Sequence, residues 1–140
     1  MYCSTKFAIE GITEALATEI APFGLRALII QPGYFRTNFL SGVSAGQNLA
    51  APLAAYDGTV AREAAANFEK FNGKQLGNPK VGAQRIWEVI RGEGLAKGKK
   101  QLLRLPLGSD TGSMMLGLAE DLKQTATEYE EIWKSTDYQD

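Results

Sequence analysis

The chain has 140 residues, with 15 basic and 16 acidic side chains and a net charge of −1 at pH 7. This balance argues against a partner such as nucleic acid or an anionic membrane surface. The length suits one domain, and 44% hydrophobic residues suffice for a core. The sequence has no histidine and one cysteine, Cys3, which excludes histidine-based catalytic triads, histidine metal sites, intrachain disulfides and cysteine-pair zinc sites.

Two further absences bear on localisation. No apolar stretch approaches the roughly 20 residues that a membrane helix needs. The N-terminus has no basic segment followed by an apolar region and a cleavage site, so we expect no signal peptide. Together with the lone cysteine, these observations are compatible with a cytoplasmic protein.

The pattern of residues 3–21 predicts a helix, because four large aliphatic residues recur at helical spacing. Small residues occupy much of its remaining surface, which implies burial on more than one side. Pro22 and Gly24 are expected to end this helix. Residues 25–31 contain a continuous apolar run, which is typical of a strand covered on both faces in a parallel sheet. The four recurring residues of the helix are Ile9, Ile12, Leu16 and Ile20.

The rest of the chain predicts further helices and one more strand. An irregular loop rich in glycine and serine fills residues 34–56. Helices are expected over residues 59–71 and 79–90, the second beginning at a proline. A short strand over residues 100–105 and an amphipathic helix over residues 114–133 complete the chain.

Tyr2 and Lys6 lie four residues apart at the start of the first predicted helix, and they therefore share one face of it. A phenol beside an ammonium suits proton transfer to a carbonyl oxygen, because the cation favours the phenolate form. The Tyr-x-x-x-Lys pattern alone is weak evidence, since it occurs by chance in about one chain of this length in four or five. The alternative interpretation is that both residues lie on a helix surface without a catalytic role.

The surrounding residues strengthen the catalytic interpretation. Tyr-Cys-Ser-Thr-Lys-Phe-Ala-Ile-Glu-Gly at residues 2–11, followed by Ile-Ile-Gln-Pro-Gly-Tyr-Phe-Arg-Thr at residues 29–37, resembles the second half of the short-chain dehydrogenase/reductase family. Residues 77–80 and 103–110 resemble family members with an extended substrate loop. The resemblance implies an α/β fold: a partial doubly wound Rossmann-like fold that lacks its N-terminal nucleotide-binding half. Residues 1–140 would form the C-terminal part of a single domain, with a substrate loop at about 38–57.

The same resemblance implies a role for five residues. Tyr2 corresponds to the catalytic tyrosine, which protonates a carbonyl oxygen or takes the proton of an alcohol. Lys6 would favour the phenolate and hydrogen-bond the nicotinamide ribose of NAD or NADP. Pro32, Gly33 and Thr37 match the segment that lies along the nicotinamide and pyrophosphate. The complete enzyme would be an oxidoreductase for a small alcohol or carbonyl substrate and would form a homo-oligomer.

Several elements of the family would precede Met1. They include the glycine-rich phosphate turn, the residue that selects between NAD and NADP, an Asn-Ala-Gly strand end and a catalytic serine. We therefore expect a truncated chain that is inactive or incomplete alone; a truncated product, a start placed too late and an excised segment remain alternatives. A second hypothesis is a catalytically silent interaction module, in which the helix beginning at Tyr2 pairs with a second copy or a full-length relative.

Three other sequence patterns are interpreted as structural features rather than functional sites. Residues 42–46 match Gly-x-Ser-x-Gly, the pattern of a hydrolase nucleophile elbow, but the chain lacks a histidine base, so we interpret them as a flexible loop. Trp87, Tyr129 and Trp133 are interpreted as packing residues rather than a ligand site. The basic run at 97–100 is interpreted as a solvated turn.

Overall fold

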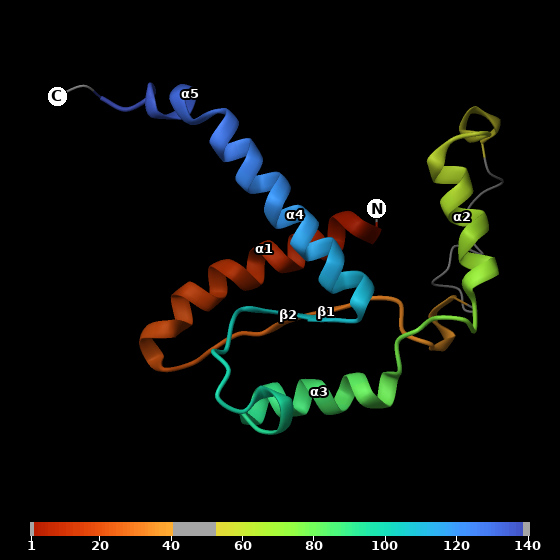
Figure 1. The fold of residues 1–140 in the computed structure, drawn as a ribbon, viewed down its shortest axis with the longest axis horizontal. Helices are drawn as coiled ribbons and strands as arrows, with labels where there is room; N and C mark the ends of the chain where they lie inside the picture. The colour runs from red at the N-terminus through yellow and green to blue at the C-terminus, as the bar shows by residue number, and fades with distance from the viewer. Residues whose placement is uncertain (1, 41–52, 139–140) are drawn as a thin grey trace. The chain divides into compact units, whose positions relative to one another are not determined.

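The computed structural model describes residues 2–40 and 53–138, which fall into two compact units (Figure 1). The first unit comprises Met1–Gly33 and Leu103–Asp140, and the second comprises Tyr34–Leu102. The helices and strands in chain order are α1 (Tyr2–Ile20), β1 (Ile29–Pro32), α2 (Val60–Phe71), α3 (Pro79–Arg91), β2 (Arg104–Leu107), α4 (Ser109–Glu128) and α5 (Glu130–Lys134).

The centre of the first unit is a two-stranded parallel sheet. Ile29 pairs with Arg104 at one end of the register, and Pro32 pairs with Leu107 at the other. Ile29 and Leu107 are both buried, each with 8% of its surface exposed. The prediction of a parallel strand in this part of the chain is confirmed, but both strands lie nearer the C-terminus than expected. The apolar run indicates which part of the chain can form a strand. The residues at which the strand begins and ends depend on the hydrogen bonds to its neighbouring strand.

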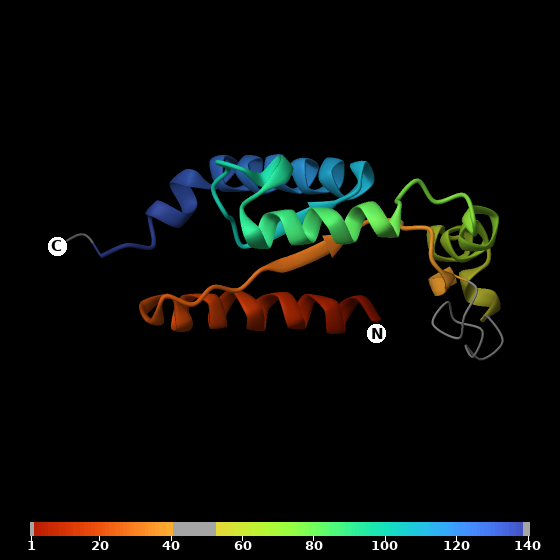
Figure 2. The ribbon, with the colours of Figure 1, turned by 90° about the horizontal axis from the view of Figure 1, so that it is seen from below.

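Two helices flank this sheet within the first unit. α1 runs opposite to β1 and lies beside it, while α4 follows β2 directly and lies beside that strand (Figure 2). As predicted, the chain turns after α1 at Gly24, which has φ +70° and donates its N–H to the carbonyl of Ala21. α4 begins five residues before the expected start at Met114. Gly108, with φ +106°, turns the chain from strand to helix in a single step.

The face of α1 that lies on the sheet differs from the expected one. Between residues 3 and 20 of the described chain, the residues that are not exposed recur every three or four positions. The aliphatic residues expected to be buried are instead exposed, at 55% for Ile9, 68% for Ile12 and 44% for Leu16. The prediction that α1 is buried on more than one side is therefore wrong for this structure. The half-buried residues are Glu10, Thr13, Ala17 and Ile20.

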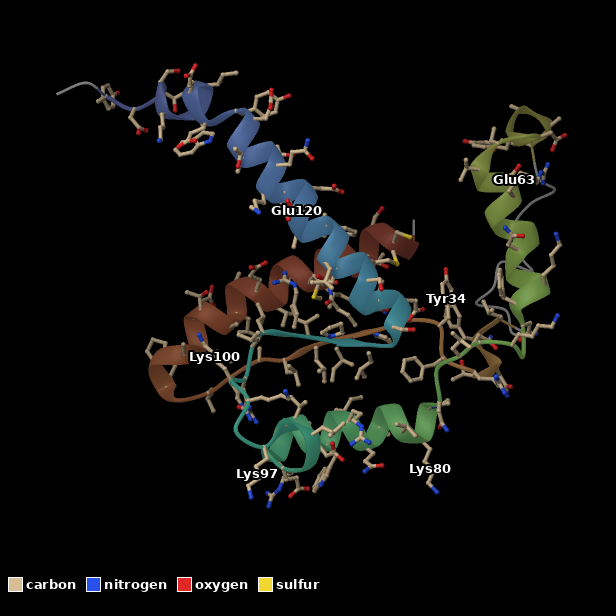
Figure 3. All side chains as sticks on the ribbon, viewed as in Figure 1. Tyr34, Glu63, Lys80, Lys97, Lys100 and Glu120 are labelled. Atoms are coloured by element: carbon tan, nitrogen blue, oxygen red, sulfur yellow. The ribbon has the colours of Figure 1, made fainter. Side chains whose placement is uncertain are left out.

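The second unit contains α2 and α3, and both helices confirm the predicted ranges to within one residue. α3 begins at Pro79 because Asn78 caps it: the Asn78 side chain accepts the N–H groups of Lys80 and Val81 at 3.0 and 3.3 Å. The helix ends at Gly92, which has φ +68°. The basic run that begins at Lys97 forms an exposed turn after α3, as predicted (Figure 3).

Two other predictions have different outcomes. The Gly-x-Ser-x-Gly pattern at 42–46 lies outside the described residues. The aromatic residues interpreted as packing residues are largely exposed, at 58% for Trp87, 54% for Tyr129 and 49% for Trp133. Burial is thus wrong for these three. Trp133 instead donates its indole N–H to the carbonyl of Ala126, within the C-terminal helical segment.

Candidate active site at the carboxyl edge of the sheet

Tyr2 and Lys6 lie on the first turns of α1, four residues apart as predicted. Because α1 runs opposite to β1, its beginning lies at the edge where both parallel strands end (Figure 2). In open α/β sheets, ligands bind outside the carboxyl ends of the strands. The predicted catalytic pair therefore lies at the edge of the sheet where a site is expected.

One hydrogen bond fixes how far along the sheet this pair lies. The Nε2 of Gln31 in β1 donates to Oε1 of Glu10 in α1 at 2.9 Å. Lys6 precedes Glu10 by four residues, or about 6 Å along the helix. Gly33 follows Gln31 by two residues, or about 6.6 Å along the strand direction. Because the two elements run in opposite directions, ideal helix and strand spacings place Lys6 near the level of Gly33 and Tyr2 about one turn further on.

The rotation of α1 about its axis is fixed as well. At about 100° per residue, Lys6 lies about 40° around the helix from Glu10, on the side of Thr13 and Ala17. Tyr2 lies about 80° from Glu10 in the same direction. These positions continue the half-buried stripe of α1 beyond the edge of the sheet, where Lys6 is exposed. The predicted catalytic pair therefore lies on the same side of α1 as the residues that contact the sheet, in the turns that precede them.

Pro32 and Gly33 end β1 at this edge. Pro32 pairs with Leu107, and the N–H of Gly33 donates to the carbonyl of Leu107 at 2.8 Å. A Cβ atom on Gly33 would lie 2.1 Å from Oδ1 of Asp110, and one on Gly108 would lie 2.4 Å from the same oxygen. The carboxylate of Asp110, in the first turn of α4, therefore occupies space that only two glycines leave open.

Thr37 belongs to the second unit. Its Oγ1 accepts the backbone N–H of Phe39 at 3.3 Å, and its side chain is exposed. The preceding Arg36 donates from Nε and Nη2 to the carbonyl of Gln75 at 3.1 and 2.9 Å. Phe35 forms a parallel bridge with Gly77. These contacts hold the Thr37 segment within its own unit. Of the predicted site residues, the structure thus gathers Tyr2, Lys6, Pro32 and Gly33 at one edge of the first unit.

A group of charged residues at the other end of the strands escaped the sequence interpretation. Arg104, the first residue of β2, contacts Oε2 of Glu14 at 3.0 Å and Oε2 of Glu10 at 3.5 Å. The hydrogen bond to Glu14 is the main reason that the pKa of Arg104 lies above its ordinary value. A signal was present in the sequence: Glu10 and Glu14 extend the four-residue spacing of Tyr2 and Lys6 along one helix face.

Comparison with known proteins connects this arrangement to a family. Residues 1–48 match the family model of the short chain dehydrogenases. The chain is 30% identical over 108 residues to the uncharacterized oxidoreductase YusZ of Bacillus subtilis, covering 76% of this chain and 36% of that protein. It is 29% identical over 133 residues to the oxidoreductase BOA17 of Botryotinia fuckeliana, covering 94% of this chain and 44% of that protein.

A solved structure agrees with these relatives. The crystal structure of a short-chain dehydrogenase from Streptomyces avermitilis matches with a TM-score of 0.71 and 30% identity, covering 98% of this chain and 46% of that one. The chain thus spans less than half the length of the relatives named above. None of the described helices is long and apolar enough to cross a membrane. The matching family model, the similar sequences and the similar fold agree, and the chain belongs to the short-chain dehydrogenase/reductase family.

Proposed function

We propose that this chain is the C-terminal part of an NAD(P)-dependent oxidoreductase domain that interconverts an alcohol and a carbonyl compound. Residues 1–140 belong to one doubly wound domain whose nucleotide-binding half is not among them, and residues 38–57 form its substrate loop. The complete enzyme acts as a homo-oligomer. The observation that carries the proposal is the common edge of α1 and β1, where Lys6 lies near the level of Gly33 beside the Pro32–Leu107 pair.

In the proposed reaction, Tyr2 donates a proton to the carbonyl oxygen of the substrate or accepts one from the alcohol. A free phenol ionises near pH 10, so at neutral pH it needs a cation to favour its ionised form. Lys6, one helical turn away, supplies that cation. Bound NAD(P) would supply or accept the hydride.

The residues at this edge suit one end of the cofactor. Lys6 offers an ammonium to the ribose hydroxyls, and Pro32 and Gly33 end β1 at the same edge. The N-terminus of α4 lies at the same edge, where a helix could otherwise bind phosphate. Asp110 in its first turn places a carboxylate there, which would repel a phosphate. The chain therefore fits the nicotinamide ribose and leaves the phosphates to the nucleotide-binding half.

The test compares this chain with a chimera in which the N-terminal half of YusZ precedes Tyr2. We expect the chain alone to leave the fluorescence of NADH and NADPH unchanged at micromolar protein, and the chimera to alter it. With a panel of carbonyl compounds, the chimera should oxidise one of the two cofactors. Tyr2→Phe should slow this reaction by about 10²- to 10⁴-fold without loss of cofactor binding.

Tyr138→Phe, which alters a tyrosine that is 94% exposed near the C-terminus, provides the matched control and should leave the rate unchanged. Micromolar binding of NADH or NADPH by the chain alone would contradict the proposal that the nucleotide-binding half binds the phosphates. An equal rate for Tyr2→Phe and the parent chimera would contradict the role of Tyr2.

One observation favours the second candidate, an interaction module. Ile9, Ile12 and Leu16 form an exposed aliphatic row along α1, next to the stripe that contacts the sheet. Paired with the same row of a second copy, this surface would be removed from water. Sedimentation analysis should then give a dimer that Ile12→Glu dissociates and Thr18→Glu, on an exposed position of the same helix, does not. A monomer at all concentrations would exclude this candidate.

A further inference from the structure

α1 is attached to the sheet mainly by polar contacts. Its large aliphatic row is exposed, and among the half-buried residues of its sheet-facing stripe only Ile20 is large and aliphatic. Apolar packing resists rotation of a helix only where side chains interlock with the opposing surface. Glu10 and Glu14 make polar contacts with the strands that oppose rotation of α1 over the sheet.

Both carboxylates meet the same guanidinium. Arg104 Nη2 lies 3.0 Å from Glu14 Oε2, and Arg104 Nε lies 3.5 Å from Glu10 Oε2. Glu10 also accepts the hydrogen bond of Gln31, so its second oxygen is held by β1. The guanidinium is planar and its donors point in fixed directions, so it constrains the positions of two groups together. With a single contact, α1 could still rotate about that point. Contacts from Glu10 and Glu14, on two successive helical turns, oppose this rotation.

We propose that Arg104 is a positioning residue that orients the Tyr2–Lys6 pair by fixing the rotation of α1. Lys6 and Tyr2 precede Glu10 by one and two helical turns, so any rotation at Glu10 is carried directly to them. A rotation by one residue position would move a Cα atom, at a radius of about 2.3 Å, by about 3.5 Å. The catalytic part of this inference rests on the proposed function, while the hold of Arg104 on α1 rests on the contacts alone.

A distance measurement tests this hold without any activity assay. Cys3 is the single cysteine of the chain, is exposed, and lies between Tyr2 and Lys6 on α1. Spin labels on Cys3 and on Ser113→Cys, an exposed position of α4, report the placement of α1 by pulsed electron paramagnetic resonance. We expect one narrow distance in the parent and a distribution broadened or shifted by about 3.5 Å in Arg104→Met. Arg104→Lys, which keeps the charge but loses the planar pair of donors, should restore only part of the narrow distribution.

Arg91→Met is the matched control, because it removes an exposed arginine of α3 in the second unit. It should leave the distribution unchanged. An unchanged distribution in Arg104→Met would overturn the proposal. If circular dichroism shows that Arg104→Met unfolds, Glu14→Gln replaces it as the test, since it removes only one of the two ion pairs. A broadened distribution would support the proposal, and an unchanged one would overturn it.

The chimera separates this inference from the proposed function. If Tyr2 and Lys6 catalyse, Arg104→Met should lower kcat by about tenfold or more and change KM by less than about twofold, because misplaced groups act on the chemical step. Arg104→Lys should recover only part of kcat, because lysine keeps the charge but not the planar pair of donors. A shifted spin-label distance with unchanged kcat would refute the catalytic role of the pair and leave the hold of Arg104 on α1 intact.

Discussion

Gly33 illustrates how a motif residue can be required for a reason that its motif does not state. Its φ is not positive, so the backbone alone does not demand glycine here. The obstacle to a side chain is the carboxylate of Asp110, which would have to shift because a Cβ atom on Gly33 would lie 2.1 to 2.4 Å from three of its atoms. The family resemblance identified Gly33 as a candidate site residue, but Asp110 is too distant along the chain for any local pattern to reveal the contact.

Gly33→Ala should therefore destabilise the first unit, by about 1–3 kcal/mol, as overpacking of a filled space does. Asp110→Ala removes the carboxylate, and in the double variant it should recover most of the loss. Chemical denaturation of the three variants measures the coupling between the two positions.

Gly11→Ala is the control, because a Cβ atom there would meet nothing within 4 Å. As a glycine inside a helix, its replacement should stabilise the chain by about 0.5–1 kcal/mol. Equal effects of Gly33→Ala alone and with Asp110→Ala would show that the carboxylate is not the obstacle.

α3 and the turn after it depend on a buried carboxylate. Glu88 has 7% of its surface exposed and accepts hydrogen bonds from Arg85, from Gln84 at 2.9 Å and from the N–H of Leu95 at 3.2 Å. These donors, the Arg85 guanidinium above all, hold the pKa of Glu88 below its ordinary value of 4.5 although burial opposes them. A Cβ atom on Gly94 would lie 2.5 Å from this carboxyl group. Helical periodicity predicted α3, but it does not distinguish this glutamate from an exposed one.

The lowered pKa makes the stability of the second unit depend on pH. A carboxylate stabilised by folding contributes fully above its unfolded pKa of about 4.5, and the contribution is lost as the pH falls through the lower folded pKa. Glu88→Gln should therefore lower the free energy of unfolding at pH 7 and flatten its decline as the pH falls below about 5. Denaturant titrations across this range measure the change. Glu63→Gln, at an exposed position of α2 (Figure 3), should keep the slope of the parent.

The start of α3 gives a second prediction for this element. Asn78→Ala removes the acceptor for the N–H groups of Lys80 and Val81 and should cost about 1 kcal/mol. Asn67→Ala, at an exposed position inside α2, replaces asparagine with a better helix former and should be neutral or slightly stabilising. Thermal unfolding followed by circular dichroism compares the two. Equal losses would mean that the Asn78 side chain does not cap α3.

For the chain in its entirety, the sequence predicted more of the elements than of their packing. The helices, the parallel strands and the family follow from periodicity and motif, which depend on neighbouring residues. The burial of side chains does not follow from periodicity and motif. Among the described residues the buried apolar side chains are Ile29, Ala96 and Leu107, although 44% of the sequence is hydrophobic. Which face of a helix is covered depends on the elements available to cover it. The edge that carries Tyr2 and Lys6 could be predicted, whereas the charged contacts behind it required coordinates.

The stability of this chain should accordingly be indifferent to the cofactor. A ligand present at about a thousandfold excess over its Kd raises the free energy of unfolding by about 4.1 kcal/mol. NADH or NADPH at about 1 mM would therefore raise the melting temperature measurably if the chain bound it with micromolar affinity. We expect no shift for this chain and a clear shift for the chimera with the YusZ half, measured by differential scanning fluorimetry. A shift for the chain alone would place a phosphate site within these residues.

The four-residue spacing along α1 also limits which sequence changes this helix can accept. Its first half carries the predicted catalytic pair, and the contacts of Glu10 and Glu14 with Arg104 follow, so both depend on the same rotation of the helix. One residue inserted between Lys6 and Glu10 would retain every side chain and leave the contacts with Arg104 intact. It would nevertheless turn the positions of Tyr2 and Lys6 by about 100° about the helix axis. The number of residues between Lys6 and Glu10 is therefore constrained, although Phe7, Ala8 and Ile9 are exposed.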